Sequence, residues 1–222
     1  MNLPKFKNQK LKEAAFIHRS CLNENPTLGL SSNERLEFLG DAIISFVVSE
    51  YLYQKFPKHQ EGDLTSFRAA LVRTKSLASL AQKLELGNHL KLSRGEEETG
   101  GRGNPSILAN TVEALVGALY LDQGMEVTKN FLQENLLPQI GEIIRTESYK
   151  DSKSRLQEIV QTEKRVAPIY KILKYSGPDH ARQFTVGVYV ENKLLGKGQG
   201  RSKQAAEEQA ARIALEKWKN FC

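Results

Sequence analysis

Apolar residues recur at helical spacing through the first two thirds of the chain. In residues 33–54, Leu36, Leu39, Ile43 and Val47 follow the i, i+3, i+4 pattern of a buried helix face, and further apolar residues extend that face. Other helices are predicted over about residues 64–84, 106–121 and 125–145, and no strand-like alternation occurs before residue 165. We therefore predict an all-α N-terminal domain.

A different pattern begins after residue 165. Three short strand-like runs, 169–175, 183–190 and 193–200, lie between a predicted helix at about 154–162 and an alanine-rich helix at 202–219. The order α-β-β-β-α predicts a small α+β domain with its helices on one face of an antiparallel sheet. The predicted division is an all-α domain over residues 1–146, a polar linker over 147–153 and the α+β C-terminal domain over 154–222.

Charge separates the same two regions. Residues 1–148 contain 17 Lys and Arg against 18 Asp and Glu, net −1, whereas residues 149–222 contain 15 against 8, net +7. A basic segment can serve solubility alone, but a compact basic domain joined to a near-neutral one is more typical of polyanion binding. Nucleic acid is therefore the partner that we favour for the C-terminal domain.

The chain carries no signal for a membrane or for export. No run of 18 apolar residues occurs, and residues 1–7 lack the apolar core of a signal peptide. Cys21 and Cys222 have neither metal-binding nor redox spacing, and a disulfide between them stays open. We expect a cytoplasmic protein without a membrane partner.

Acidic side chains interrupt the predicted helix over residues 33–54. Glu34, Glu37 and Asp41 lie within about 60° of one another on a helical wheel, so they share one stripe. Glu34 alone is more typical of a solvated residue paired with Arg19 or Arg35. Asp41 falls where the pattern indicates buried core, and a buried acid is unfavourable unless a cation neutralises it.

A second apolar helix carries the other half of this pattern. Asn110 and Glu113 share one of its faces, and Glu113 is the only charged residue between Arg102 and Asp122. Together, the two helices predict a cluster of oxygen ligands for a divalent cation. Mg²⁺ is the expected ion, because it is bound by a few carboxylates, keeps several waters and serves phosphate chemistry.

The segment Asn33–Ala42 resembles the signature of bacterial ribonuclease III. The resemblance continues through residues 15–20, 61–64, 71–73, 100–102 and 106–122. It implies a homodimeric Mg²⁺-dependent endoribonuclease, with Mn²⁺ as a substitute ion, that cuts double-stranded RNA to 5′-phosphate and 3′-hydroxyl ends and processes ribosomal RNA precursors and other structured transcripts. The resemblance implies metal ligands at Glu37, Asn110, Asp41 and Glu113, catalytic roles for Asp41 and Glu113, and supporting roles for Glu34, Glu61 and Glu96.

Three of these residues, Glu61, Glu96 and Asn110, leave alternatives open. Glu61 and Glu96 lie in loop-like sequence, where solvated acids are common. Asn110 stands where the family has Asp, and its amide oxygen can coordinate a cation but carries no charge. A catalytically weakened or inactive RNA-binding relative is therefore one alternative, and a nuclease for RNA–DNA hybrids is another. We favour the active enzyme because Glu37, Asp41 and Glu113 are all present.

Residues 151–220 resemble a double-stranded-RNA-binding domain. Such domains recognise the A-form shape through two minor grooves and the phosphates between them. The last helix opens with Gly198-Gln-Gly-Arg-Ser-Lys203, and its N-terminal dipole favours phosphate. Gln204 replaces a lysine of the family pattern. The expected RNA-binding residues are Gln157, Glu158 and Gln161 on the first helix, His180 in a loop, and Arg201, Ser202 and Lys203 at the last helix.

Overall fold

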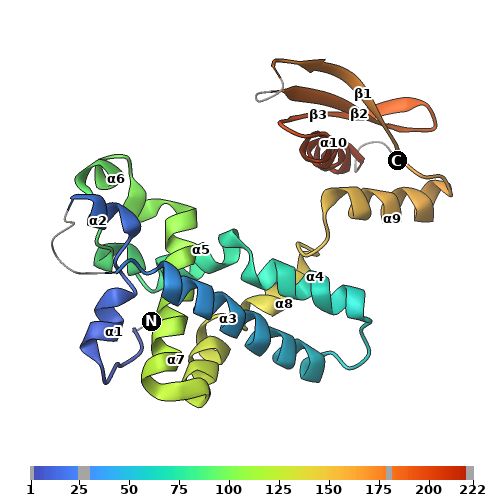
Figure 1. Cartoon of the computed structure of the whole chain (residues 1–222). Coiled ribbons are helices and arrows are strands. Elements are labelled where there is room, and N and C mark those ends of the chain that lie inside the picture. The colour runs from blue at the N-terminus through green and yellow to red at the C-terminus, as the bar shows by residue number, and fades with distance from the viewer. Residues whose placement is uncertain (1–2, 25–30, 179–181, 219–222) are drawn as a thin grey trace. The chain divides into compact units, whose positions relative to one another are not determined.

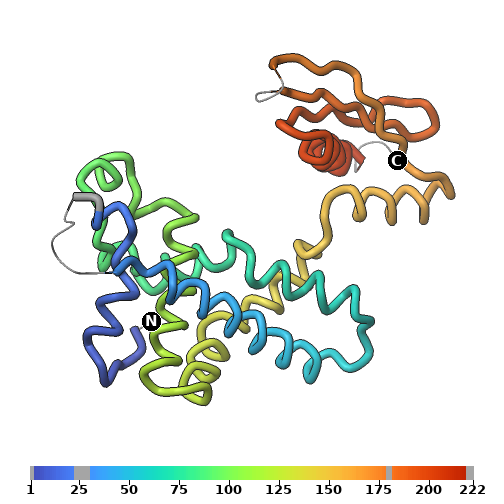
Figure 2. Tube along the Cα trace, in the orientation of Figure 1, coloured from blue at the N-terminus to red at the C-terminus, as the bar shows by residue number. Residues whose placement is uncertain are grey.

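The computed structural model describes residues 3–24, 31–178 and 182–218. The chain forms two compact units that divide between Tyr149 and Lys150, a helical unit and a sheet unit (Figures 1 and 2). His180 and Cys222 lie outside the described residues. None of the helices in the described ranges combines the length and hydropathy that a membrane crossing requires.

The helical unit confirms the predicted all-α architecture. Among the described residues of this unit, the only β pairing is an isolated bridge between Ile17 and Lys91. Two short 3₁₀ turns, η2 (Leu86–His89) and η3 (Gly101–Gly103), connect its later helices. The helices are α1 (Gln9–Ala14), α2 (Arg19–Glu24), α3 (Glu34–Lys55), α4 (Glu61–Val72), α5 (Thr74–Lys83), α6 (Arg94–Glu98), α7 (Pro105–Asn135) and α8 (Gln139–Arg145).

Two expected helices are interrupted. The helix expected over 64–84 is broken at Arg73, whose extended backbone ends α4 and begins α5, and the Ser76 hydroxyl donates to the Ala70 carbonyl across the break. The helix expected over 125–145 is the end of α7 followed by α8, with Pro138 at the start of α8. Gly124, at φ 79°, forms a kink within α7.

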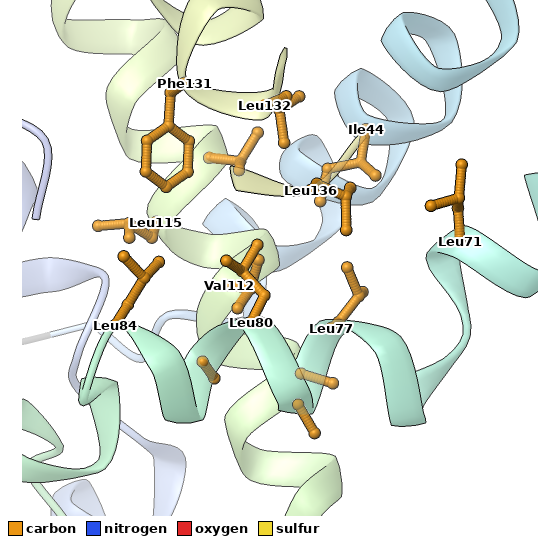
Figure 3. Packing of buried hydrophobic residues seen from close by; sticks show 14 of the residues in the cluster. Ile44, Leu71, Leu77, Leu80, Leu84, Val112, Leu115, Phe131, Leu132 and Leu136 are labelled. Atoms are coloured by element: carbon orange, nitrogen blue, oxygen red, sulfur yellow. The ribbon is translucent and has the colours of Figure 1, made fainter. Parts of the chain in front are cut away.

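The core of the helical unit forms where α3, α5 and α7 pack together. Ile44, Leu80 and Leu115 are at most 1% exposed, and Figure 3 shows them meeting side chains from α4 and the end of α7. The α3 and α7 backbones are in direct contact. A Cβ atom on Gly40 would lie 1.8 Å from the Glu113 carbonyl oxygen, and one on Gly117 would lie 2.2 Å from the Leu36 carbonyl oxygen. Only glycine fits at either position.

The sheet unit confirms the predicted α-β-β-β-α order. Its antiparallel sheet has the strand order β1-β2-β3, and α10 packs against β2, β3 and α9. The glycines of β3 allow this close packing, since a Cβ atom on Gly198 would lie 2.2 Å from the Ala206 carbonyl oxygen. The elements are α9 (Ser152–Lys164), β1 (Ile169–Ser176), β2 (Gln183–Val190), β3 (Lys193–Gly200) and α10 (Lys203–Trp218).

Gly40→Ala and Gly117→Ala are each expected to lower the free energy of unfolding by about 2 kcal/mol or more, because the added methyl group must push two helix backbones apart. Urea unfolding measures the effect. Gly141→Ala on α8 is the matched control, because nothing lies within 4 Å of its added Cβ atom. We expect that control to be neutral or slightly stabilising. Equal stability of all three variants would contradict the close contact.

Candidate active site

The contact between α3 and α7 brings the acids of the two helices together. Gly40 touches the backbone of Glu113, so Glu37 and Asp41 on α3 lie beside Glu113 on α7. Burial, followed by the charges of Asp41 and Glu37, raises the pKa of Glu113 to about 7. Burial also raises the pKa of Glu37, and Glu34 and Asp41 add to this. These side chains therefore form one electrostatic cluster.

The position of Asp41 corrects the expectation from the apolar pattern. Asp41 is exposed, and Glu37 and Glu113 are half-buried, so the cluster lies at the surface of the helical unit rather than within its core. Gly40 and Ile43 face the core in its place. The apolar pattern failed here because α3 has more apolar residues than the core of one unit accommodates.

The donor set fits a hard divalent cation by its chemistry. Among residues 3–24, 31–178 and 182–218, no three or more His, Cys, Asp or Glu side chains are already arranged to hold a metal ion. Nevertheless, Glu37, Asp41 and Glu113 supply carboxylate oxygens and Asn110 an amide oxygen, which are the ligands that Mg²⁺ prefers. Burial and repulsion from Asp41 and Glu37 raise the pKa of Glu113, and a cation would offset that repulsion.

Asn110 occupies the exposed edge of this cluster. Its side chain hydrogen-bonds to Glu37, and this contact opposes the increase in the pKa of Glu37. An Asp at this position would add a fourth negative charge instead of a hydrogen-bond donor. In the protein without a bound ion, the Asn110 amide therefore offsets part of the repulsion among Glu37, Asp41 and Glu113.

The three acids predicted as supporting residues occupy different places. Glu34 is exposed, lies 3.7 Å from Arg19 and accepts a 2.7 Å hydrogen bond from Ser32. Glu61 begins α4, and Glu96, on α6, packs against Gly101. The charges that raise the pKa of Glu113 belong to Asp41 and Glu37, not to Glu61 or Glu96.

In the sheet unit, the expected RNA-binding residues that the structure describes are exposed. Gln157 of α9 and Ser202 before α10 line one surface pocket of about 640 Å³ with Gln204, which brings two of the expected contact regions together. Glu158 forms an ion pair with Lys150. The pocket is also lined by Lys153 and Ser154 of α9 and by Asp151, Ala205 and Glu208, none of which was selected from the sequence.

The two units match two families of protein domain. Residues 8–140 match the ribonuclease-III-like family, and residues 152–218 match the double-stranded RNA binding motif. The curated Ribonuclease 3 of Streptococcus gordonii is 46% identical to this chain over 98% of the chain and 93% of its own length. The Ribonuclease 3 of Desulforamulus reducens is also 46% identical, over 96% of this chain and 86% of its own length.

A solved structure agrees with these matches. The nuclease domain of ribonuclease III from Campylobacter jejuni is 43% identical, with a TM-score of 0.54, and the match covers 60% of this chain and 86% of that one. The fold and the matches thus define a two-domain endoribonuclease with a double-stranded-RNA-binding domain. This chain belongs to the ribonuclease III family.

Without metal, Glu113→Gln is expected to stabilise the protein more at pH 8 than at pH 5. The pKa of Glu113 is raised from an ordinary 4.5 to about 7, so its contribution to stability is complete below about pH 4.5 and is lost as pH rises through 7. Thermal unfolding with a chelator across this range measures the difference. Glu126→Gln, on an exposed position of the same helix, is the control. A constant difference between parent and Glu113→Gln at all pH values would contradict the shift.

Proposed function

We propose that this chain is a homodimeric, Mg²⁺-dependent endoribonuclease that cuts double-stranded RNA to 5′-phosphate and 3′-hydroxyl ends. The observation that supports it most is the cluster of Glu37, Asp41 and Glu113 at the contact between α3 and α7. The nuclease domain spans residues 1–146 and the RNA-binding domain residues 154–222. Ribosomal RNA precursors and other structured transcripts in the cytoplasm are the proposed substrates.

The positions of the acids suggest different roles in metal binding and catalysis. Glu37, Asp41, Glu113 and the Asn110 amide would hold the ion, with Mn²⁺ as a substitute for Mg²⁺. Bound Mg²⁺ supplies positive charge to the scissile phosphate and lowers the pKa of a bound water. Asp41 is exposed and therefore accessible to an RNA phosphate, whereas Glu113 is held against Gly40. We assign catalytic roles to these two, and supporting roles to Glu34, Glu61 and Glu96.

An uncovered aromatic face on α3 supports the homodimer. Phe38, Phe46 and Tyr53 are 81%, 55% and 76% exposed, and they lie within about 80° of one another around the helix. A groove of about 1110 Å³ lies beside Phe38, and its apolar lining comes from Leu11, Ala14, Ile17, Leu36, Leu39 and Leu121. A second copy of the chain would cover both the face and the groove through a two-fold interface.

The dimer also fits the substrate. One acid cluster serves one scissile phosphate at a time, and a duplex has two strands, so two clusters are required. The cluster lies on α3 beside the uncovered face, which would place the two active sites of a dimer on either side of one interface. The nuclease domain of ribonuclease III from C. jejuni, which is 43% identical to this chain, has structural flexibility in a region involved in dimer formation.

The sheet unit would hold the duplex. Gln157, Glu158 and Gln161 on α9 are exposed and would face a minor groove, and Arg201, Ser202 and Lys203 lie at the start of α10, where phosphate binding is favoured. We keep His180 as a proposed contact from its sequence position alone. The predicted binding is weakened steeply by salt and depends little on sequence.

Asn110→Asp is expected to lower the Mg²⁺ concentration needed for half-maximal cleavage of double-stranded RNA by severalfold, because it adds one negative charge to the ligand set. A Mg²⁺ titration of cleavage rates for parent and variant measures the shift, with Glu126→Gln as the control. No cleavage by the parent at any Mg²⁺ concentration, together with cleavage by the variant, would contradict the proposed activity and favour the inactive relative.

Phe38→Ser is expected to shift the protein from dimer toward monomer, because it removes the most exposed aromatic side chain of the uncovered face. Light scattering after size-exclusion chromatography measures the mass. Tyr175→Ser, which removes a 66% exposed aromatic residue from the sheet unit, is the control and should leave the mass unchanged. A parent that is monomeric throughout the micromolar range would overturn the proposed dimer.

A further inference from the structure

The residues after α8 form a fixed cap rather than a free segment. The Ser148 N–H donates to the Ile143 carbonyl at 3.0 Å, and the Glu147 N–H donates to the Ile144 carbonyl at 3.1 Å. Glu147 has the left-handed backbone, φ 51°, that this pair of bonds requires. This pattern is the Schellman motif, which closes a helix C-terminus and directs the chain that follows. Residues 147–148 therefore belong structurally to α8.

Two further contacts fasten this segment to α4 and to the start of α5. Arg73, which lies between those helices, donates from Nη1 to the Ser148 carbonyl at 3.0 Å. The Tyr149 ring packs edge-on against Phe67 at 4.6 Å and 87°. Phe67 is 1% exposed and also contacts the ring of Phe56, so Tyr149 joins the main core of the helical unit. Such aromatic pairs stabilise beyond the area that they bury.

The residues on the other side of the junction are fastened to α9. Lys150 forms an ion pair with Glu158, and the Asp151 carboxylate accepts a 2.8 Å hydrogen bond from the Ser154 N–H at the start of the helix. Tyr149 is therefore held by one unit, and Lys150 and Asp151 by the other. The sequence around residues 147–153 is polar and gives no sign of these contacts.

We propose that Arg73 and Tyr149 are positioning residues that confine the pivot between the two domains to the Tyr149–Lys150 junction. This inference rests on the proposed function, in which both domains engage one RNA duplex. A short pivot keeps the RNA-binding domain at a high effective concentration near the active site. Releasing residues 147–149 would add about three free residues at this junction, which lowers the effective concentration severalfold.

Tyr149→Ser and Arg73→Met test whether the contacts with Phe67 and Ser148 hold residues 147–149 in place. Tyr149→Phe and Arg145→Met are the matched controls. Tyr149→Phe keeps the ring, and Arg145 is an exposed residue of α8 paired with Glu142. Backbone NMR relaxation of the full chain should show residues 147–149 as rigid as α8 in the parent and in the controls. In the two test variants the same residues should become mobile while both domains remain folded.

Cleavage kinetics give the functional readout. On a duplex long enough for both domains, KM should rise severalfold in the two test variants, while kcat stays unchanged. On a duplex too short for the RNA-binding domain, KM should not change. Inserting three Gly/Ser residues after Tyr149 leaves the fastening intact and should reproduce the rise in KM, so the test does not depend on the folding of the substituted variants.

Two results would overturn the inference. One is a parent whose residues 147–149 are as mobile as an unstructured linker. The other is an unchanged KM on long duplexes in the insertion variant, which would show that the length of the pivot does not limit RNA capture. If the parent cuts no RNA, the proposed function fails, while the relaxation measurements still decide whether the segment is fastened.

Discussion

The direct contact between the backbones of α3 and α7 is the constraint on which the rest of the helical unit depends. Gly40 and Gly117 each meet a carbonyl oxygen of the opposite helix, so neither helix can shift without a clash or a gap. The packed side chains of α5 close around this pair. Because the contact is made at Glu113 itself, core packing and the placement of the acids are consequences of the same geometry.

This geometry carries an electrostatic penalty that the proposed function explains. The fold holds Glu37, Asp41 and Glu113 close enough to repel one another, and it partly buries two of them. A cluster of like charges persists in a folded protein only when the surrounding structure enforces it, and such clusters are common at functional sites. Asn110 modifies this balance by donating a hydrogen bond to Glu37, so it lowers repulsion where an Asp would increase it.

Much of the fold could be predicted from the sequence, because its signals are local. The helical spacing around Ile43 predicts α3, and the switch to alternation after residue 165 predicts the sheet unit. The breaks at Arg73 and Pro138 were missed, because apolar spacing continues across both. The exposure of Asp41 was missed for a different reason: an uncovered helix face and a buried one have the same apolar composition, and only packing separates them.

The candidate site, like the fold, could be predicted from the sequence only in part. Glu37, Asp41 and Glu113 could be selected from charge within apolar helices and from the family resemblance, but their proximity depends on packing between residues more than 70 positions apart. The polar composition of residues 147–153 predicts a linker, whereas Tyr149 packs against Phe67, a long-range contact that no local pattern reveals. No signal in the sequence indicates that Asn110 bonds to Glu37.

The most direct test of the central claim is the anomalous diffraction of crystals soaked in Mn²⁺. The predicted result is a Mn²⁺ peak within coordination distance of carboxylate oxygens of Glu37, Asp41 and Glu113 at the contact between α3 and α7. The peak should be absent from crystals of the Glu37→Gln/Glu113→Gln double variant. A parent crystal with no peak at this contact, or with Mn²⁺ bound only elsewhere, would contradict the assignment of these acids as the metal site.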